Sequence, residues 1–456
     1  MLIGAFLYPT GYHVAAWRHP SAQADAGVNF AHYAGLARKA EDAGFDFLFL
    51  PDSSSAKGKN LDALSRTAVR YVAQFEPTTL LAALAAVTTK IGLIATVSTS
   101  FNEPYNVARA FASLDHISGG RMAWNLVTSQ NPEEAANFSL ERHPAHADRY
   151  RRAREFALVV RGLWDSWDDD AFPRDKITGL FFDPEKRHVL HHRGEYFSVQ
   201  GPLNLPRTPQ GRPLIVQAGA SASGRDLAAE TADLVFTAQN ALDEAVAFRN
   251  DIRARAAGYG RRFEDLKVIV GVQTHLGLTS AEAEAKRGEL TNLIHPAMAL
   301  SLLEAELGGF DLSAHQLDGP VPELPPSNSG QSRQTLLLKL ARRENYTLRQ
   351  LADHVAGARG HLEIAGTPSS VADTLQAWLD AGAADGFMFM PALLPAGLED
   401  VGALLLPELR RRGLLADRRE SATFRERVGL PKLQAAAASP SRTASKETGD
   451  CDLPAR

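Results

Sequence analysis

The sequence predicts an α/β fold of the (β/α)8 TIM-barrel class, and three observations lead to that prediction. Short apolar runs alternate with amphipathic helical segments along most of the chain. Eight such runs are found, and their near-continuous apolar character is typical of a parallel sheet that is covered on both faces. The length of 456 residues suits one large barrel with insertions. An open, doubly wound sheet is the alternative that the same alternation allows.

The expected strands are short apolar runs that end at polar or turn-forming residues. They are residues 2–8, 45–50, 91–97, 122–127, 212–219, 233–236, 267–278 and 386–391. The first run illustrates the pattern, because it is followed directly by a Pro-Thr-Gly sequence that is typical of a turn.

The expected helices lie between these strands and repeat their apolar residues with helical spacing. They are residues 30–44, 78–88, 106–118, from about 147 to 167, 223–232, 242–257, 368–382 and 398–413. The first helix is closed by Gly44 and the third by Gly119 and Gly120, as glycine commonly closes helices.

Two segments interrupt the repeat. Residues 165–211, rich in Asp, Pro and His, form a long excursion before the fifth strand. Residues 291–366 interrupt the seventh unit, and so long an insertion is usually a lid over a site or is disordered. The tail 434–456 has few large apolar residues and is expected to be disordered. We therefore expect one domain over residues 1–433.

Composition excludes several classes of protein. The net charge of -4 argues against nucleic-acid binding through a basic field. Cys451 is the single cysteine, so no disulfide or thiolate metal cluster forms within one chain. No apolar run is long enough to span a membrane. The first residues lack the basic region of a signal peptide, so we expect a cytoplasmic protein.

Candidate site residues stand at the carboxyl ends of the strands, where barrels of this class carry their chemistry. They are His13, Asp52, Ser98, Asn125, Thr128, His146, Tyr150, Ser221, Ser223 and Gly224. This set is rich in uncharged hydrogen-bonding groups and poor in carboxylates. It suits a neutral heterocycle better than a metal or a glycosidic bond, and we expect no metal site.

Residues 219–226, Gly-Ala-Ser-Ala-Ser-Gly-Arg-Asp, follow a strand and open a helix. Small residues let backbone N–H groups converge, and a helix N-terminus favours an anion, so a phosphate is the expected ligand. The Lys and Ser/Thr of a nucleotide-binding P-loop are missing, which argues against an NTPase. A tight turn between strand and helix is the alternative.

Four of the candidate residues have structural alternatives. His146 and Tyr150 stand four residues apart on one helix face and can both donate to a ligand, or they are a helix-terminal histidine and a half-buried tyrosine. Asp52 contacts a ligand or is an ordinary loop residue. Asn125 lies inside an apolar run, and a buried amide without a partner costs about 1–3 kcal/mol. Its partner is either a ligand or the backbone of a neighbouring strand.

Six segments together resemble one known family. They are PTGYHVAAWRHP (9–20), STSFNEPYNVARAFASLDHISGGRMAWNLVTS (98–129), HADRYRRAREF (146–156), LWDSW (163–167), RGEYFSVQGPLNLPRTPQGRPLIVQAGAS (193–221) and GTPSSVADTLQAWLDAGAADGFMFMP (366–391). They resemble the nitrilotriacetate monooxygenase group of the bacterial-luciferase-like flavin monooxygenases, which also contains EDTA, dibenzothiophene-sulfone, dimethyl-sulfide and long-chain alkane monooxygenases. The resemblance covers about residues 1–415.

The resemblance implies a (β/α)8 barrel that receives FMNH2, reduced FMN, from a separate NAD(P)H:flavin reductase. The reduced flavin would react with O2 to a C4a-(hydro)peroxide and oxygenate a small organic substrate. FMN contacts are implied at Asp52, Ser98, His146, Tyr150 and Ser221. The phosphate would lie at 221–225, and a homodimer or higher homo-oligomer is implied.

The remaining expectations concern the flavin ring and the proton chemistry. Asn125 and Thr128 are expected to bond the isoalloxazine edge or the ribityl chain. His13 is the candidate for proton transfer or hydrogen bonding near the peroxide, with a surface-loop histidine as the alternative. Two other functions are weighed: an F420-dependent hydride-transfer oxidoreductase of the same superfamily, and a non-catalytic flavin-binding protein.

Overall fold

The computed structural model describes residues 1–56, 58, 60–325, 331–415 and 423–433, with only the backbone at 331 and 332. The predictions for Cys451 and for a disordered tail at 434–456 lie outside the described residues. Within the described part of the chain, no helix is long and apolar enough to span a bilayer.

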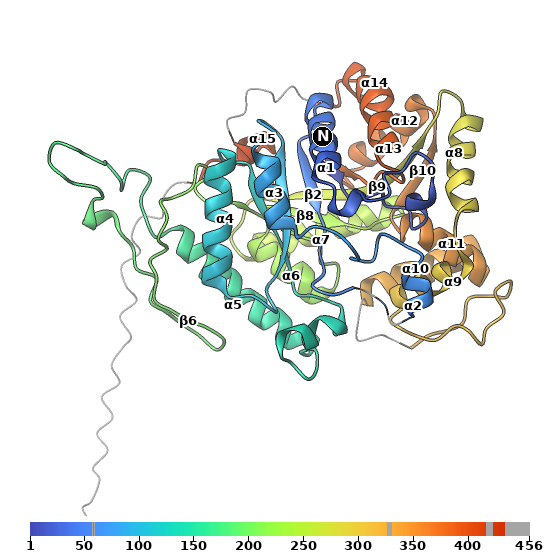
Figure 1. Cartoon of the computed structure of the whole chain (residues 1–456), viewed down its shortest axis with the longest axis horizontal. Coiled ribbons are helices and arrows are strands. Elements are labelled where there is room, and N and C mark those ends of the chain that lie inside the picture. The colour runs from blue at the N-terminus through green and yellow to red at the C-terminus, as the bar shows by residue number, and fades with distance from the viewer. Residues whose placement is uncertain (57, 59, 326–330, 416–422, 434–456) are drawn as a thin grey trace, which may run out of the picture.

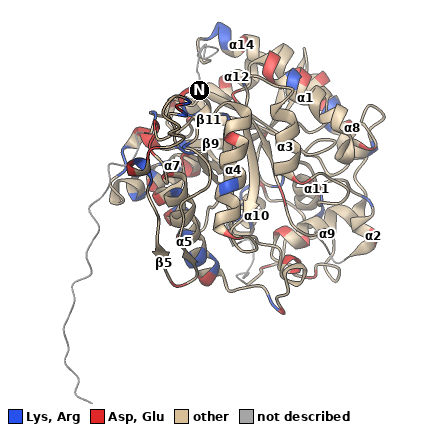
Figure 2. Ribbon diagram, turned by 60° about the vertical axis from the view of Figure 1, so that its left-hand side comes forward, with Lys and Arg blue, Asp and Glu red and all other residues tan. Residues whose placement is uncertain are grey.

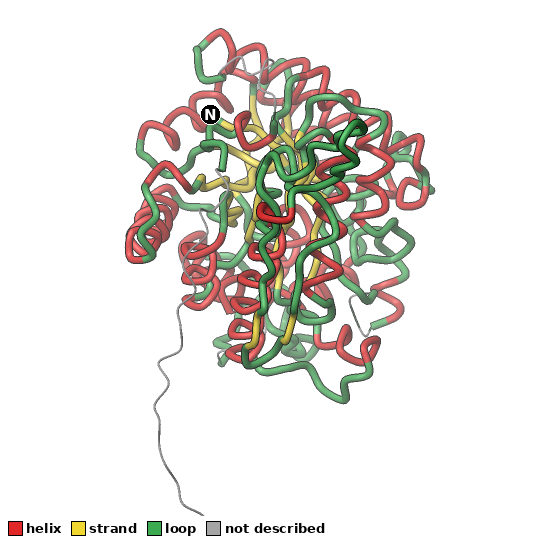
Figure 3. Tube along the Cα trace, turned by 90° about the vertical axis from the view of Figure 1, so that its left-hand side faces the viewer, coloured by secondary structure: helices red, strands yellow, loops and turns green. Residues whose placement is uncertain are grey.

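Eight parallel strands close into a barrel (Figures 1 and 3). In order around the barrel they are β1 (Leu2–Phe6), β2 (Phe47–Leu50), β3 (Gly92–Ser98), β4 (Met122–Val127), β7 (Leu214–Gln217), β8 (Leu234–Thr237), β9 (Lys267–Leu276) and β11 (Gly386–Phe389). Pairing of β11 with β1 completes the circle. All eight predicted strands are confirmed, and the closure excludes the open sheet.

Helices surround the strands, and the charged residues lie mainly on these helices and on the loops (Figure 2). They are α1 (Phe30–Ala43), α2 (Leu61–Leu64), α3 (Pro77–Ala85), α4 (Pro104–Ser118), α5 (His146–Trp164), α6 (Ala222–Thr231), α7 (Leu242–Gly258), α8 (Ser280–Asn292), α12 (Pro368–Asp380), and a last helix made of α13 (Ala396–Asp400), the π-helical η6 (Val401–Leu405) and α14 (Leu406–Arg411). Short 3-10 turns cover Ala16–Arg18, Ala26–Val28, Pro132–Phe138, Pro184–Lys186 and Phe263–Asp265.

The predicted helices are confirmed, and the short α2 and the longer α8 are additions. Gly44 closes α1 in the left-handed conformation, at φ 91°, as its position predicts. Helix α8 was missed because it buries only Ala283 and Leu290, so its apolar stripe is weak.

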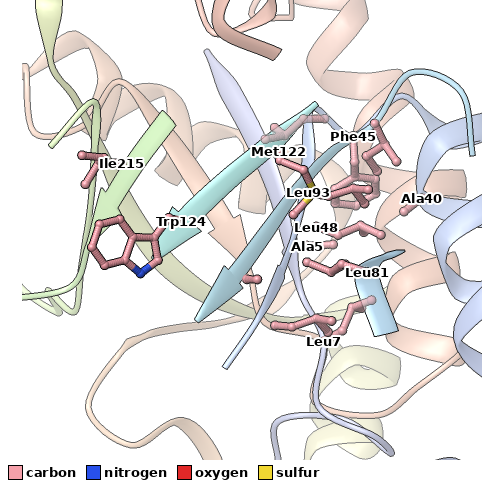
Figure 4. Close-up of a cluster of buried hydrophobic side chains, with 14 of the residues drawn as sticks. Ala5, Leu7, Ala40, Phe45, Leu48, Leu81, Leu93, Met122, Trp124 and Ile215 are labelled. Carbon is pink, nitrogen blue, oxygen red and sulfur yellow. The ribbon is translucent and has the colours of Figure 1, made fainter. Parts of the chain in front are cut away.

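Two apolar layers hold the barrel together, because alternate side chains of each strand point to opposite faces. One layer lies between strands and helices, and Figure 4 shows Ala5, Leu48 and Leu93 of neighbouring strands beside Ala40 and Leu81 of the covering helices. The other layer fills the barrel interior with side chains that include Phe47, Phe49, Ile94, Ala123 and Phe236. The interior is therefore packed, and open space remains at one end.

The excursion before the fifth strand is mostly loop, with one short hairpin of β5 (His192–Arg193) and β6 (Ser198–Val199). Glu155 of α5 holds this hairpin, since its carboxylate accepts hydrogen bonds from the backbone N–H groups of Tyr196 and Phe197, both at 2.9 Å. The segment thus packs along α5 on the outside of the barrel.

The insertion at 291–366 is largely helical, although no helix was predicted within it. It contains α9 (Pro296–Glu306), α10 (Gln331–Glu344), α11 (Leu348–Ala358) and β10 (Leu362–Gly366). Strand β10 pairs with β9 outside the closed circle. Helices α9 and α11 pack against each other. The start of α11 has a local signal that was overlooked, a capping box between Thr347 and Gln350.

Candidate functional site

Two adjoining cavities lie at the carboxyl ends of the strands. Their volumes are ≈ 200 Å³ and ≈ 1110 Å³. They share a wall made by residues after β4 and β7, together with Tyr71 and Tyr150. Helices α9 and α10 of the insertion form the far wall of the larger cavity, to which Glu306 and Arg333 contribute. The cavities thus lie where barrels of this class bind their ligands.

The structure brings six of the ten predicted site residues to these cavities. They are Asp52, Thr128, His146, Tyr150, Ser221 and Gly224. These residues come from four separate loops or helix starts, so the closure of the barrel is what brings them together.

Residues 219–225 form a close turn between β7 and α6. Ser221 is the N-cap of α6, and its hydroxyl accepts a hydrogen bond from the Gly224 N–H at 3.1 Å. A Cβ on Gly224 would lie 3.0 Å from the Tyr150 hydroxyl oxygen and 3.0 Å from the Cα of Gly219. The loop is therefore packed closely enough to require glycine, while its outer face lines the larger cavity.

The first turn of α5 supplies a second wall of the site. The rings of His146 and Tyr150 lie 4.7 Å apart, as their spacing predicts. Between them, the buried Arg149 donates hydrogen bonds to the carbonyl oxygens of Thr128 and Ser129. Burial and the nearby Arg149 charge lower the pKa of His146, so its ring is neutral near pH 7. Arg149 thus holds the loop after β4 in place.

Two carboxyl groups face the smaller cavity. Burial, reinforced by the charge of Glu76, raises the pKa of Asp52 to about 7. Glu134 was missed by the sequence analysis; its carboxylate accepts hydrogen bonds from the Ser53 hydroxyl and the Ser54 N–H, both at 2.8 Å. The signal for it was the pair of acidic residues that follows Asn131 and Pro132, just beyond the fourth strand.

Ser98 and Asn125 lie one layer deeper than the cavity walls. The Ser98 hydroxyl is 2.7 Å from that of Ser129, which itself lines the smaller cavity. Asn125 points into the barrel and donates from Nδ2 to the Thr96 hydroxyl of β3 at 2.9 Å. Its Oδ1 is buried and has no partner among the described residues. The Asn125 donor therefore bonds a side chain of the neighbouring strand and not the strand backbone that the structural alternative named.

Ser223 and His13 stand apart from the cavities. Ser223 is exposed on the outer face of α6. His13 is buried, and its Nδ1 accepts a hydrogen bond from the Ala15 N–H at 3.2 Å. Burial, with the neighbouring His275, lowers the pKa of His13 to about 3. The ring is neutral near pH 7 and not a ready proton donor, and the predicted role of His13 stays a prediction.

The wall that follows β1 contains Tyr8, Arg359 and His361, which are not among the predicted site residues. The hydroxyl of Tyr8 accepts a hydrogen bond from Arg359 at 3.1 Å and lies 3.1 Å from the Tyr71 hydroxyl. The Arg359 guanidinium lies 4.6 Å from the centre of the Tyr12 ring, and the ring of His361 meets Tyr12 edge-on. Tyrosines at the end of a strand were a signal, whereas Arg359 and His361 belong to the insertion and carry no motif.

Possible metal ligands do not cluster in the described part of the chain. Over the described ranges, no group of three His, Cys, Asp or Glu side chains is placed to hold a metal ion. The site is instead a polar and aromatic chamber with a glycine-lined loop.

Comparisons with known proteins agree on one family. The family model described as luciferase-like monooxygenase matches residues 10–385. The chain is 50% identical to N-acetyl-S-(2-succino)cysteine monooxygenase of Bacillus subtilis (strain 168), over 94% of this chain and 96% of that one. It is 46% identical to nitrilotriacetate monooxygenase component A of Aminobacter aminovorans, over 97% and 99% of the two chains.

Two solved structures resemble this chain over nearly its whole length. The crystal structure of DmoA from Hyphomicrobium sulfonivorans superposes with a TM-score of 0.85 at 31% identity, covering 94% of this chain and 92% of that one. A riboflavin lyase solved with modified FMN and riboflavin superposes with a TM-score of 0.84 at 32% identity, covering 94% and 95%. An F420-dependent reductase from Methanopyrus kandleri reaches 0.54 at 16% identity, covering 89% and 99%, and shares the fold only.

Proposed function

Because this chain belongs to the luciferase-like monooxygenase family, we propose that it works as the oxygenase component of a two-component system and uses FMN in its reduced form. Flavin-dependent oxygenation itself follows from near full-length similarity to named monooxygenases. The observation that carries the finer proposal is the glycine-lined loop at 219–225, which opens into a chamber at the barrel mouth.

The residues present fit FMN. A phosphate suits the backbone N–H groups of the α6 N-terminus, where a Cβ on Gly224 would fill the space beside Tyr150. The orphaned Oδ1 of Asn125 is an acceptor that a donor from the chamber side would satisfy. Pockets for small molecules usually measure about 300–1,000 Å³. A cavity of ≈ 1110 Å³ therefore has room for a flavin together with a small substrate.

When bound, the reduced flavin supplies the electrons that activate O2, and one oxygen atom goes to the substrate. The chain's own residues would bind and orient the flavin. Ser221, Tyr150 and His146 would hold the phosphate and ribityl end, and Thr128 would bond the ring edge. Asp52, whose pKa is about 7, would hold or release a proton at its carboxyl oxygen near neutral pH.

Ser98 and Asn125 would support this site from the layer beneath, Ser98 through Ser129. Ser223 would contribute only through the conformation of the loop. His13 lines neither cavity, so it would act only through its neighbours, as a neutral hydrogen-bonding group, because its low pKa removes the imidazolium form. Helices α9 and α10 would act as the lid that excludes water.

The partners proposed with this function are O2, a small organic substrate, a separate NAD(P)H:flavin reductase and a second copy of the chain. The word component in the name of the Aminobacter aminovorans relative supports a separate reductase. Two relatives are named for acting on nitrilotriacetate and on N-acetyl-S-(2-succino)cysteine, both of which carry carboxylates.

The test is anaerobic titration of the full chain with FMNH2, followed by oxygen uptake with a flavin reductase, NADH and candidate substrates. We expect FMNH2 to bind more tightly than oxidised FMN and oxygen uptake to yield oxygenated product. Binding of reduced F420 in place of FMNH2 would support the hydride-transfer alternative. Flavin binding without oxygenated product would support the non-catalytic one.

A further inference from the structure

Arg359 is a buried cation on the cavity wall. Arg359 is 8% exposed and lines the larger cavity. Its described hydrogen bonds go to the Tyr8 hydroxyl and, at 3.5 Å, to the Val69 carbonyl, and its Nε is buried without a partner. Among the described residues, no carboxylate lies within 4.0 Å of the guanidinium. A buried charge of this kind normally has a counterion.

The side chains around Arg359 do not supply a counterion for Arg359 alone. Burial raises the pKa of Tyr12 to about 12 and that of Tyr71 well above its usual value, so both phenols are neutral. Burial keeps His361 neutral as well, because it lowers the pKa of that ring. Burial disfavours the charge of Arg359, but Tyr8, Tyr12 and Glu306 favour it and raise its pKa, so the guanidinium stays a cation. Glu306 also lies 3.9 Å from Arg333. One carboxylate is thus shared by two guanidinium groups, and the net charge of these three side chains is positive.

The end of helix α11 does not remove the imbalance. Arg359 follows α11 directly, and a cation is favoured at a helix C-terminus. That gain is several times smaller than the cost of desolvating an ion. Arg359 also takes a left-handed backbone conformation, φ 49°, which is uncommon for a non-glycine residue and is often found at functional sites.

This wall lies across the barrel from the proposed phosphate loop. Tyr8 and Tyr12, which contact Arg359, follow β1, whereas Ser221 follows β7. Strand β7 stands four places from β1 in a circle of eight, so the two loops face each other over the barrel mouth. The same cavity reaches both walls. The Arg359 guanidinium can thus contact a second ligand while the FMN phosphate occupies the loop at 219–225.

We propose that Arg359, flanked by Arg70 and Arg333, binds a carboxylate of the substrate, and that the substrates of this enzyme are small carboxylate-bearing molecules. Arg70 is 4% exposed and lines the same wall. A guanidinium presents paired N–H donors that match the two oxygens of a carboxylate. This inference rests on the proposed function, since it places the substrate beside bound flavin.

The experiment measures binding rather than turnover. The full chain, saturated with FMNH2 under anaerobic conditions, is titrated calorimetrically with nitrilotriacetate, with N-acetyl-S-(2-succino)cysteine and with uncharged nitrilotriacetamide. The variants are Arg359→Met, Arg359→Lys and, as matched control, Arg349→Met, since Arg349 lies on α11, the helix that Arg359 follows, and forms an exposed pair with Asp318. FMNH2 affinity is measured for each protein separately.

We expect at least one carboxylate probe to bind at least tenfold more tightly than the triamide. Arg359→Met should weaken that binding by about 30-fold or more, the lower limit reported for losing one partner of a buried, hydrogen-bonded charge pair. Arg359→Lys should fall between Arg359→Met and wild type, and Arg349→Met should match wild type. Affinity for the triamide and for FMNH2 should not change.

Equal affinity for charged and uncharged probes, or no binding of either carboxylate while FMNH2 still binds, would overturn the anion subsite and leave the proposed function standing. If the wild-type protein does not bind FMNH2, the proposed function itself is wrong. If Arg359→Met does not fold, Arg359→Lys decides, because an unchanged carboxylate affinity in that variant contradicts paired recognition by the guanidinium.

Discussion

At the scale of single residues, the pKa of Asp52 is the feature with the clearest consequence for pH dependence. The carboxyl is largely buried beside Glu76 and Glu134, so the charged form is disfavoured. Its pKa is about 7 in the folded protein against the usual 3.8. The folded protein therefore holds this proton more tightly than the unfolded chain does.

The Asp52 contribution to stability is fully present below about pH 4 and is lost as the pH rises through 7. Asp52→Asn mimics the protonated form and removes this dependence. We expect the melting temperature of wild type, without flavin, to fall relative to that of Asp52→Asn between pH 4 and pH 8. Thermal melts at half-unit pH steps measure the difference, and parallel curves for the two proteins would contradict the raised pKa.

The close packing of Gly224 gives a second prediction at this scale. In Gly224→Ala the new Cβ would lie 3.0 Å from the Tyr150 hydroxyl and 3.0 Å from Gly219. Since one of them must shift, we expect FMN affinity to fall by about tenfold, equivalent to about 1.4 kcal/mol. Flavin fluorescence titration measures the effect.

Gly288 of α8 provides the matched control for that substitution, because a Cβ there meets nothing within 4 Å. Gly288→Ala should leave FMN binding unchanged and add about 0.5–1 kcal/mol of stability, since glycine is unfavourable inside helices. Equal FMN affinity in both variants would show that the loop tolerates a side chain and that the phosphate lies elsewhere.

At the scale of elements, the insertion is a packed helical unit and not a loose loop. Leu351 of α11 is fully buried against an apolar cluster that includes Leu302 and Leu303 of α9. The same two helices carry or adjoin cavity residues, among them Glu306 and Arg359. Packing inside the insertion thus determines the shape of the proposed substrate wall.

Leu351→Ala should leave a cavity in this cluster and cost about 2–5 kcal/mol in the free energy of unfolding, or of local unfolding of the insertion. We expect more H2O2 per oxygen consumed, because a looser wall admits water to the flavin. Denaturant titration and a peroxide assay measure the two effects. An unchanged peroxide yield alongside the lost stability would separate the insertion from water exclusion.

At the scale of the whole molecule, the two ends of the barrel have different roles. The carboxyl ends of the strands hold the cavities, and the other end is closed by α15 (Phe424–Arg427). The Phe424 ring packs 5.7 Å from the ring of Phe47 inside the barrel. Arg425 forms a buried ion pair with Asp233 at 3.1 Å. These long-range contacts are why we propose that residues 1–433 act as one domain.

Phe424→Ala should cost about 3–5 kcal/mol of stability, as expected for a fully buried aromatic side chain. Since Phe424 lies at the end opposite to the cavities, FMN affinity should stay within twofold of the wild-type value. Urea unfolding and flavin titration of the same preparation check the two statements. A large loss of FMN affinity in the folded variant would show that the two ends are coupled.

Much of the fold was predictable because it depends on short-range patterns. The period of apolar residues, the glycine that closes α1 and the turn after the first strand each act over a few residues. All eight barrel strands followed from them. Helix α8 did not, because it buries too few residues to show a stripe. Strand β10 and helices α9–α11 were not predicted either, because they lie inside a segment that was treated as one insertion.

The sequence by itself determined the strand order, the barrel class and six residues of the candidate site, since those residues directly follow strands or begin helices. Only the tertiary structure decided which side chains meet. Arg359 bonds Tyr8 across 351 positions of the chain. Asn125 turned out to point into the barrel toward Thr96, one layer below the cavities. No local pattern encodes such contacts, because barrel closure and the packing of the insertion set the distances between remote segments.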